Sequence, residues 1–307
     1  MVYACLIKIE TMTEPTLSAN GMTIGIGVLA TEKNELNAKP SHLVLIADTM
    51  GSFSDEYSHP RLHKLFDFPQ TNLYAAAAGQ IDQAAALMPM INQNLAQTPS
   101  DKRSFGDIVR GVAQSLFMFK MEKFNLTVLP KYGMPPASIA PTSSIRPSSL
   151  IAAMAMVPPA VQSELEKEWR EFSLGCDLII GAFDHTGQAV LMCQYGHEPE
   201  LRNVTFPGYW VIGSGAANAI FWLSHREHVL GMRLQRAAYH AYEAKLMAEG
   251  SAHVNEHLDI LVATRGKHWH ISTHKPNPKT DCPISFAQLK KWRNKYGPSN
   301  TGLLDKA

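Results

Sequence analysis

Residues 22–30 (MTIGIGVLA) and 43–48 (LVLIAD) are both short and almost wholly apolar runs, of the kind that forms buried strands. The polar stretch 31–42, which contains asparagine and proline, separates them and is expected to be a loop. Two more strands are expected at 64–68 and 73–78, with the turn sequence PQTN between them. The first part of the chain is therefore predicted to be a run of strands.

The pattern then changes to a helical period. Apolar residues recur at helical spacing over 80–97, where Pro89 is expected to kink the helix. They recur again from Phe105 to Phe124, with Ser104 as the expected N-cap. The remaining expected elements are, in order, strands at 177–183, 189–195 and 209–212, helices at 216–223 and 229–249, and strands at 258–264 and 267–272.

The order is thus strands, a pair of helices, strands, a second pair of helices and a last pair of strands. A parallel doubly wound sheet would alternate single strands with single helices instead. Strands in runs and helices in pairs predict an α/β (α+β) fold in which two mostly antiparallel sheets pack face to face. With the helix pairs outside, this is a four-layer αββα sandwich.

We expect one domain over residues 23–272, interrupted at about 126–161 by a proline-rich insertion. Residues 1–22 have neither strand nor helix period and are interpreted as a leader or a mis-assigned start. Residues 273–307 are interpreted as a tail whose segment 283–296 forms a short basic amphipathic helix, packed on its own domain or on a neighbour.

Composition narrows the class of protein. With 28 Lys and Arg against 27 Asp and Glu in 307 residues, the net charge of +1 gives no field that would attract nucleic acid or acidic lipid. The four cysteines form no CxxC pair, which favours a reducing cytoplasm and argues against a structural zinc. No phosphate-binding GxxxxGK[ST], dinucleotide fingerprint or GxSxG elbow is present, so no cofactor is expected.

Seven sequence blocks, in order over 22–272, resemble the proteasome β-type fold of the N-terminal nucleophile (Ntn) hydrolases, including bacterial proteasome-like proteins. The blocks are MTIGIGVLA, LVLIADTMGS, RLHKLFDF, LYAAAAGQIDQAAAL, CDLIIGAFDHTGQAVLMCQYG, YWVIGSGAANAIFWL and VNEHLDILVATRGKHWHI. The resemblance implies hydrolysis of peptide or amide bonds by an N-terminal threonine. It also implies a peptide or protein substrate and assembly into a homo-oligomeric ring, and leaves any ATPase partner unknown.

The chemistry of such a site requires particular residue types. A threonine hydroxyl is a weak nucleophile until a base removes its proton, and the residue's own free α-amine can be that base. The reference pKa of an α-amine is about 7.7–8.0, and a nearby lysine ammonium lowers it further. A carboxylate must hold the lysine, and a backbone N–H must stabilise the oxyanion.

The resemblance assigns these roles to particular residues. Thr23 is the expected nucleophile, Lys64 the essential lysine and Asp48 the carboxylate that pairs with it. Gly79 is expected to supply the oxyanion N–H, and Ser214, within GSG, to hydrogen-bond near the nucleophile. Without the resemblance, the spacing alone favours a structural interpretation, in which Asp48 is a turn acid and Lys64 a solvated charge at a strand end.

The repeated IGIG allows two registers against the family pattern. One places Thr23 at the nucleophile, and the other places Gly21 there and predicts a dead site. We favour the first, with Met22 as the true initiator or with cleavage before Thr23. The alternatives are a catalytically inactive subunit of the same fold with a structural or assembly role, and an Ntn amidohydrolase that is not a peptidase.

One departure from the family pattern favours the inactive alternative. Where the family has an Asp and a Ser that support the threonine's amine, this chain has Ser251 and Val254. A valine side chain forms no hydrogen bonds, so either Asn255 or Glu256 substitutes for the missing group or the amine is less well tuned.

Histidines cluster near the end of the last strand. His268, His270 and His274 lie close in sequence, but no acidic residue is spaced to complete a metal shell. They are therefore expected to be solvated strand residues rather than metal ligands, and the same is expected of His225 and His228.

Overall fold

The structure is a computed structural model. It describes residues 23–32, 38–49, 63–133, 158–198, 200–250, 254, 256–273 and 281–296, together with the backbone of 51–54 and 57–59. The expected leader at 1–22 lies outside these residues, as do 134–157 of the expected insertion and Ser251, Asn255 and His274.

Two antiparallel sheets form the centre of the molecule. The first has the strand order β10-β1-β2-β11-β12, and the second has the order β5-β6-β7-β8-β9. The strands of the first sheet are β1 (Ile24–Ala30), β2 (His42–Asp48), β10 (Tyr209–Gly213), β11 (Leu258–Thr264) and β12 (Lys267–Ser272). Those of the second are β5 (Leu65–Phe68), β6 (Leu73–Gly79), β7 (Cys176–Phe183), β8 (Ala189–Gln194) and β9 (Arg202–Asn203). A separate ribbon pairs β3 (Gly51–Ser54) with β4 (Tyr57–His59).

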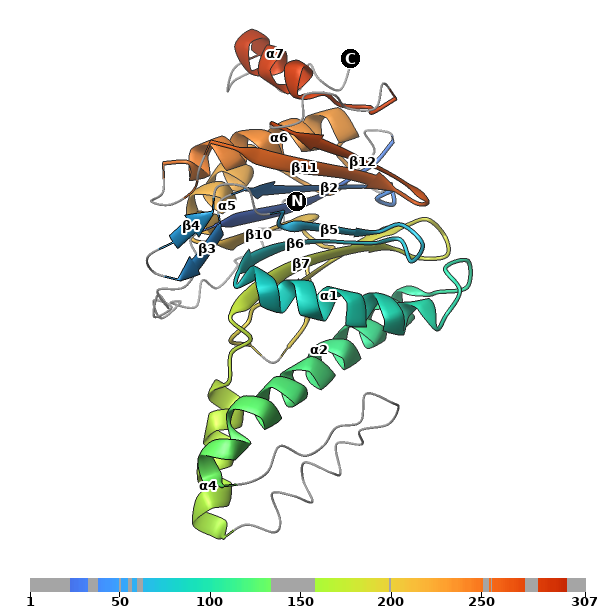
Figure 1. Cartoon of the computed structure of the whole chain (residues 1–307). Helices are drawn as coiled ribbons and strands as arrows, with labels where there is room; N and C mark the ends of the chain where they lie inside the picture. The colour runs from blue at the N-terminus through green and yellow to red at the C-terminus, as the bar shows by residue number, and fades with distance from the viewer. Residues whose placement is uncertain are drawn as a thin grey trace, which may run out of the picture.

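Helix pairs cover the two outer faces, as Figure 1 shows. The helices α1 (Ile81–Ala96) and α2 (Phe105–Thr127) pack on the second sheet. The helices α5 (Ala216–His225) and α6 (Leu234–Ala248) pack on the first. Apolar side chains fill a third core between the sheets. The predicted four-layer sandwich is confirmed.

The IGIG sequence of β1 allows the two sheets to approach closely. Ile24, Ile26 and Val28 point toward α5 and α6, so the intervening residues face the second sheet. A Cβ added at Gly27 would lie 2.7 Å from Cγ2 of Ile179 on β7, well inside van der Waals contact. A Cβ at Gly25 would lie 2.9 Å from Cγ1 of Ile212 on β10, the neighbouring strand of the same sheet. Glycine is therefore required here by space rather than by backbone conformation.

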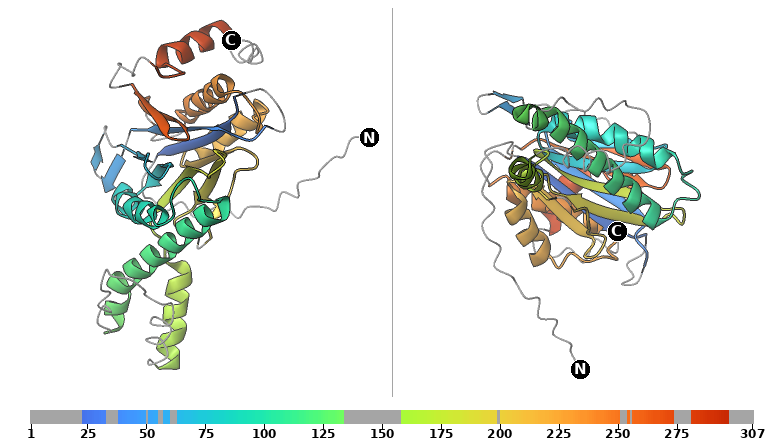
Figure 2. Two further views of the ribbon diagram at one scale, coloured as in Figure 1. Left: turned by 90° about the vertical axis from the view of Figure 1, so that its right-hand side faces the viewer. Right: turned by 90° about the horizontal axis from the view of Figure 1, so that it is seen from below.

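A proline-led helix was not expected from the sequence. The helix α4 (Pro159–Glu171) begins with Pro159 at its first position, where the missing N–H costs nothing. It packs with the last turn of α2 around Phe124 and Leu165, and the pair extends away from the sandwich (Figure 2). The prolines at 158 and 159 thus start a helix, where the sequence pattern indicated only irregular structure.

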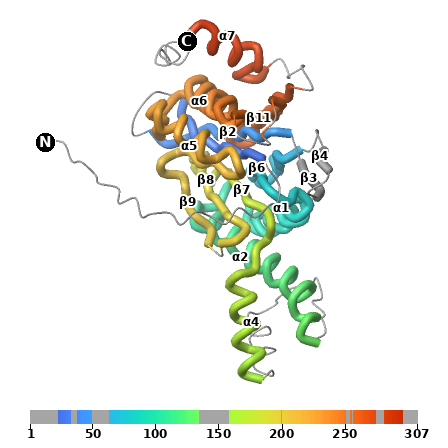
Figure 3. The backbone as a smooth tube through the Cα atoms, turned by 90° about the vertical axis from the view of Figure 1, so that its left-hand side faces the viewer, coloured from blue at the N-terminus to red at the C-terminus, as the bar shows by residue number. Residues whose placement is uncertain are grey.

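The C-terminal helix α7 (Phe286–Tyr296) packs on its own domain. This was one of the two alternatives expected from the sequence. Leu289 is fully buried against the α6 side of the first sheet, and Phe286 packs edge-on against Tyr242 of α6. Figure 3 shows α7 lying beyond α6. Among the described residues, no helix is both long and apolar enough to cross a membrane.

Substituting Gly27→Ala is expected to destabilise the protein by about 1–3 kcal/mol, because the added methyl overpacks the space between the sheets. The free energy of unfolding from urea denaturation measures the effect. Gly106→Ala is the matched control, since the nearest atom to a Cβ at this helical position is 3.8 Å away. The control should be neutral or stabilising by up to about 1 kcal/mol. Equal effects of the two substitutions would contradict the packing argument.

Candidate active site

Four of the five residues expected from the sequence meet at the ends of strands from both sheets. Thr23 immediately precedes β1, and Asp48 is the last residue of β2. Ser214 follows β10 in the same sheet, whereas Lys64 directly precedes β5 of the second sheet. The site therefore depends on how the two sheets are stacked.

Asp48 is the centre of the hydrogen-bond network. The Thr23 hydroxyl donates to Asp48 Oδ1 at 2.6 Å, and the Lys64 ammonium donates to the same oxygen at 2.7 Å. Lys64 Nζ also donates to Thr23 Oγ1, and the backbone N–H of Ile24 reaches Asp48 Oδ1 at 3.0 Å. The threonine hydroxyl is thus held between an ammonium and a carboxylate.

Ser214 fixes the backbone of the same threonine. Its hydroxyl accepts from the Thr23 nitrogen at 3.2 Å and lies 3.4 Å from the Thr23 carbonyl oxygen. Gly213 has a φ of +91°, and any Cβ there would collide with the carbonyl of Thr23. The first glycine of the GSG motif therefore allows Ser214 to approach Thr23 closely.

The ion pair at this site is almost completely excluded from water. The side chains of Lys64 and Asp48 are 1% and 0% exposed, and Thr23 is 2% exposed. Burial lowers the pKa of Lys64, while the charge of Asp48 and its hydrogen bond oppose that shift. Removal of either partner would leave the other charge buried and unpaired, so the two residues act as a unit.

Gly79 lies at the same end of the second sheet as Lys64. It ends β6 with a φ of +86°, a conformation that favours glycine. Two residues earlier, the N–H of Ala77 donates to the carbonyl of Lys64 at 2.9 Å. The expected role of the Gly79 N–H in an oxyanion hole stays a prediction.

A carboxylate near the site was missed in the sequence. Asp259 lies on the buried strand β11 with little exposure, and its Oδ2 pairs with His63 Nδ1 at 3.3 Å. His63 is the neighbour of Lys64, so this pair borders the candidate site. The available signal was an acid within the apolar run LDILVAT, where an unpaired charge would be costly.

The expected departure from the family pattern lies beside the site. Val254 is buried, and its Cγ2 would lie 3.1 Å from a Cβ added at Gly215, the residue after Ser214. An apolar side chain therefore occupies the position at which the family pattern has a serine. Glu256 is exposed.

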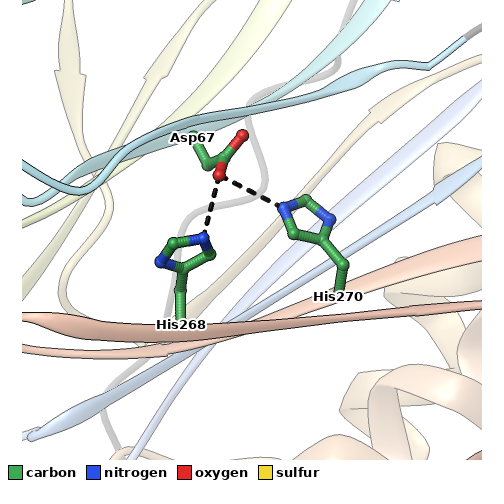
Figure 4. Close-up of side chains that lie close together, drawn as sticks. All are labelled: Asp67, His268 and His270. Carbon is green, nitrogen blue, oxygen red and sulfur yellow. Dashed lines mark ion pairs between the residues drawn. The ribbon is translucent and has the colours of Figure 1, made fainter. Parts of the chain in front are cut away.

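The expectations for several histidines need correction, although His225 is exposed as expected. An acidic partner does exist for His268 and His270, because Asp67 of β5 lies against both (Figure 4). His228 is buried rather than solvated, lies against His240, and has its pKa lowered to about 3 by burial. Sequence spacing missed both contacts because each partner comes from another element.

No family model and no curated protein matches this chain. Among solved structures, it is similar to the Gly-1 mutant of Anbu from Hyphomicrobium sp. strain MC1. The sequence identity is 15% and the TM-score is 0.54, over 93% of this chain and 97% of that chain. At this identity the similarity shows the fold alone, which is proteasome-like.

Lys64→Met is expected to lower the free energy of unfolding by about 3–5 kcal/mol, because it leaves the Asp48 carboxylate buried without its cationic partner. Adding Asp48→Asn to this variant should recover part of the lost free energy of unfolding, because it removes the unpaired buried charge. Urea denaturation of the single and double variants measures the coupling.

The control is Lys131→Met, which breaks an exposed ion pair with Glu168 (N–O distance 3.4 Å). It should cost less than about 1 kcal/mol. If Lys64→Met costs no more than this control, the buried pair does not stabilise the site as argued.

Proposed function

We propose that this chain is a threonine-type hydrolase of peptide or amide bonds, with Thr23 as its nucleophile once the residues before it have been removed. The observation that carries the proposal is the contact of one threonine hydroxyl with both Lys64 and Asp48. Buried clusters of a hydroxyl, an ammonium and a carboxylate are uncommon unless chemistry requires them, because each charge costs desolvation energy.

The position of the Thr23 nitrogen supports a free amine as the base. This nitrogen lies next to Ser214 Oγ, which would orient the amine formed by cleavage before Thr23. The buried Lys64 ammonium favours the neutral form of that amine, since two positive charges repel each other. A neutral amine can accept the hydroxyl proton.

The reaction then proceeds in two steps. The Thr23 oxygen attacks the carbonyl carbon of the substrate while its proton passes to the α-amine. The carbon–nitrogen bond breaks, the leaving amine takes that proton, and an ester to Thr23 remains. Water then attacks the ester with the amine again as base, which releases the acid and restores the hydroxyl. Donors such as the Gly79 N–H would stabilise the oxyanion in both steps.

Thr23→Ala is expected to reduce hydrolysis of short fluorogenic peptides by on the order of a thousandfold or more, because it removes the nucleophile. The assay is run on two preparations: the chain as expressed, with its N-terminus identified by intact mass, and a form released from a fusion so that it begins at Thr23. Trapped ester should add the acyl mass to the peptide that contains Thr23.

The matched control is Thr31→Ala, at the other end of β1. Thr31 is equally buried, and its hydroxyl donates to the carbonyl of Gly231 at 2.9 Å. This variant should keep full activity if it folds. If neither preparation hydrolyses peptides or simple amides, the proposal is wrong and the inactive-subunit alternative stands.

We further propose that the chain assembles with copies of itself into a ring. The proteasome-like fold supports this, since the comparison covers nearly the whole of both chains. Native mass spectrometry is expected to give a single closed oligomer rather than a ladder of sizes. A monomer at micromolar concentration would contradict the proposal.

A further inference from the structure

Three side chains meet at the open edge of the sandwich, away from the threonine. Asp67 comes from β5, the edge strand of the second sheet, and His268 and His270 come from β12, the edge strand of the first. The two histidines alternate with Trp269, which packs toward the helices, so both imidazoles face the other sheet. Figure 4 shows them converging on the carboxylate.

The distances between the three side chains fit shared coordination of a metal ion as well as an ion pair. Oδ2 of Asp67 lies 3.0 Å from Nε2 of His268 and 3.5 Å from Nε2 of His270. One ligand atom from each residue lies within 4.8 Å of the other two. Ligands at about 2.0–2.2 Å from a tetrahedral ion stand roughly 3.4 Å apart, so small side-chain rotations would complete the geometry.

We propose that Asp67, His268 and His270 form a binding site for a divalent transition-metal ion of the zinc class. Two imidazoles and one carboxylate suit Zn²⁺ and its neighbours, whereas Ca²⁺ and Mg²⁺ prefer oxygen ligands throughout. The three side chains are 25–43% exposed, so an ion can enter and water can fill the remaining position.

Tyr74 supports this assignment. It stands opposite Asp67 in the β5–β6 register, and its ring lies 5.9 Å from the His268 ring. Its hydroxyl is buried and has no hydrogen-bond partner among the described residues. A water molecule at the ion would give this donor an acceptor.

An ion at this site would link the edge strands of the two sheets. Asp67 lies three residues after Lys64, on the strand that Lys64 directly precedes. Binding would therefore hold β5 against β12 and stabilise the folded chain by mass action.

The test titrates the full, metal-free chain with Zn²⁺ by calorimetry and with Co²⁺ by visible absorption, without any assay of hydrolysis. One saturable site is expected, together with a melting temperature that rises with Zn²⁺ concentration. His270→Gln and Asp67→Asn should each weaken binding by more than about tenfold and abolish the thermal shift, with circular dichroism confirming the fold.

His197→Gln is the matched control. His197 is 62% exposed, and Glu198, 3.9 Å away, is its ion-pair partner. This variant should bind the metal as tightly as the unaltered chain. Absence of saturable binding, or equal affinity in His270→Gln and the unaltered chain, would overturn the proposal, because binding would then come from other histidines or not occur.

Discussion

The face-to-face packing of the two sheets positions both the core and the candidate active site. Gly27 of β1 leaves room for the side chains of the second sheet, and the apolar core between the sheets fills that space. The candidate active site is assembled across the same interface, since Thr23 and Asp48 belong to one sheet and Lys64 to the other. A small change in sheet spacing would separate the ammonium from its partners, because interiors are close-packed and do not deform continuously.

The two charged side chains of the candidate site lie in the protein interior, where burial of a charge costs free energy. A lysine and an aspartate with almost no exposure offset each other's desolvation only through short contacts. The threonine hydroxyl that joins them gains a donor and an acceptor in fixed positions, which is the preorganisation that covalent catalysis needs. The edge cluster of Asp67, His268 and His270 differs, because its half-exposed groups leave an ion free to enter.

The similarity to Anbu supports the fold, whereas the local geometry supports the proposed function. At 15% identity over nearly the whole chain, the similarity establishes a proteasome-like arrangement of layers and no more. One fold supports many activities, so function rests on particular side chains. The proposed function rests on Thr23, Asp48, Lys64 and Ser214, whereas Val254 beside Gly215 departs from the pattern of the resembled family.

The order of the layers could be predicted from the sequence alone, because the alternation between strand and helix periods is a local property of the chain. Together with the family resemblance, it also pointed to Thr23, Asp48, Lys64, Gly79 and Ser214. The contacts that join four of these residues through Thr23, including the one between Thr23 and Lys64, are visible only in the tertiary structure. The contact of Asp67 with His268 and His270 is likewise a product of the tertiary structure. These residues lie about 200 positions apart and meet only because the two sheets stack, which a local hydrophobic period cannot predict.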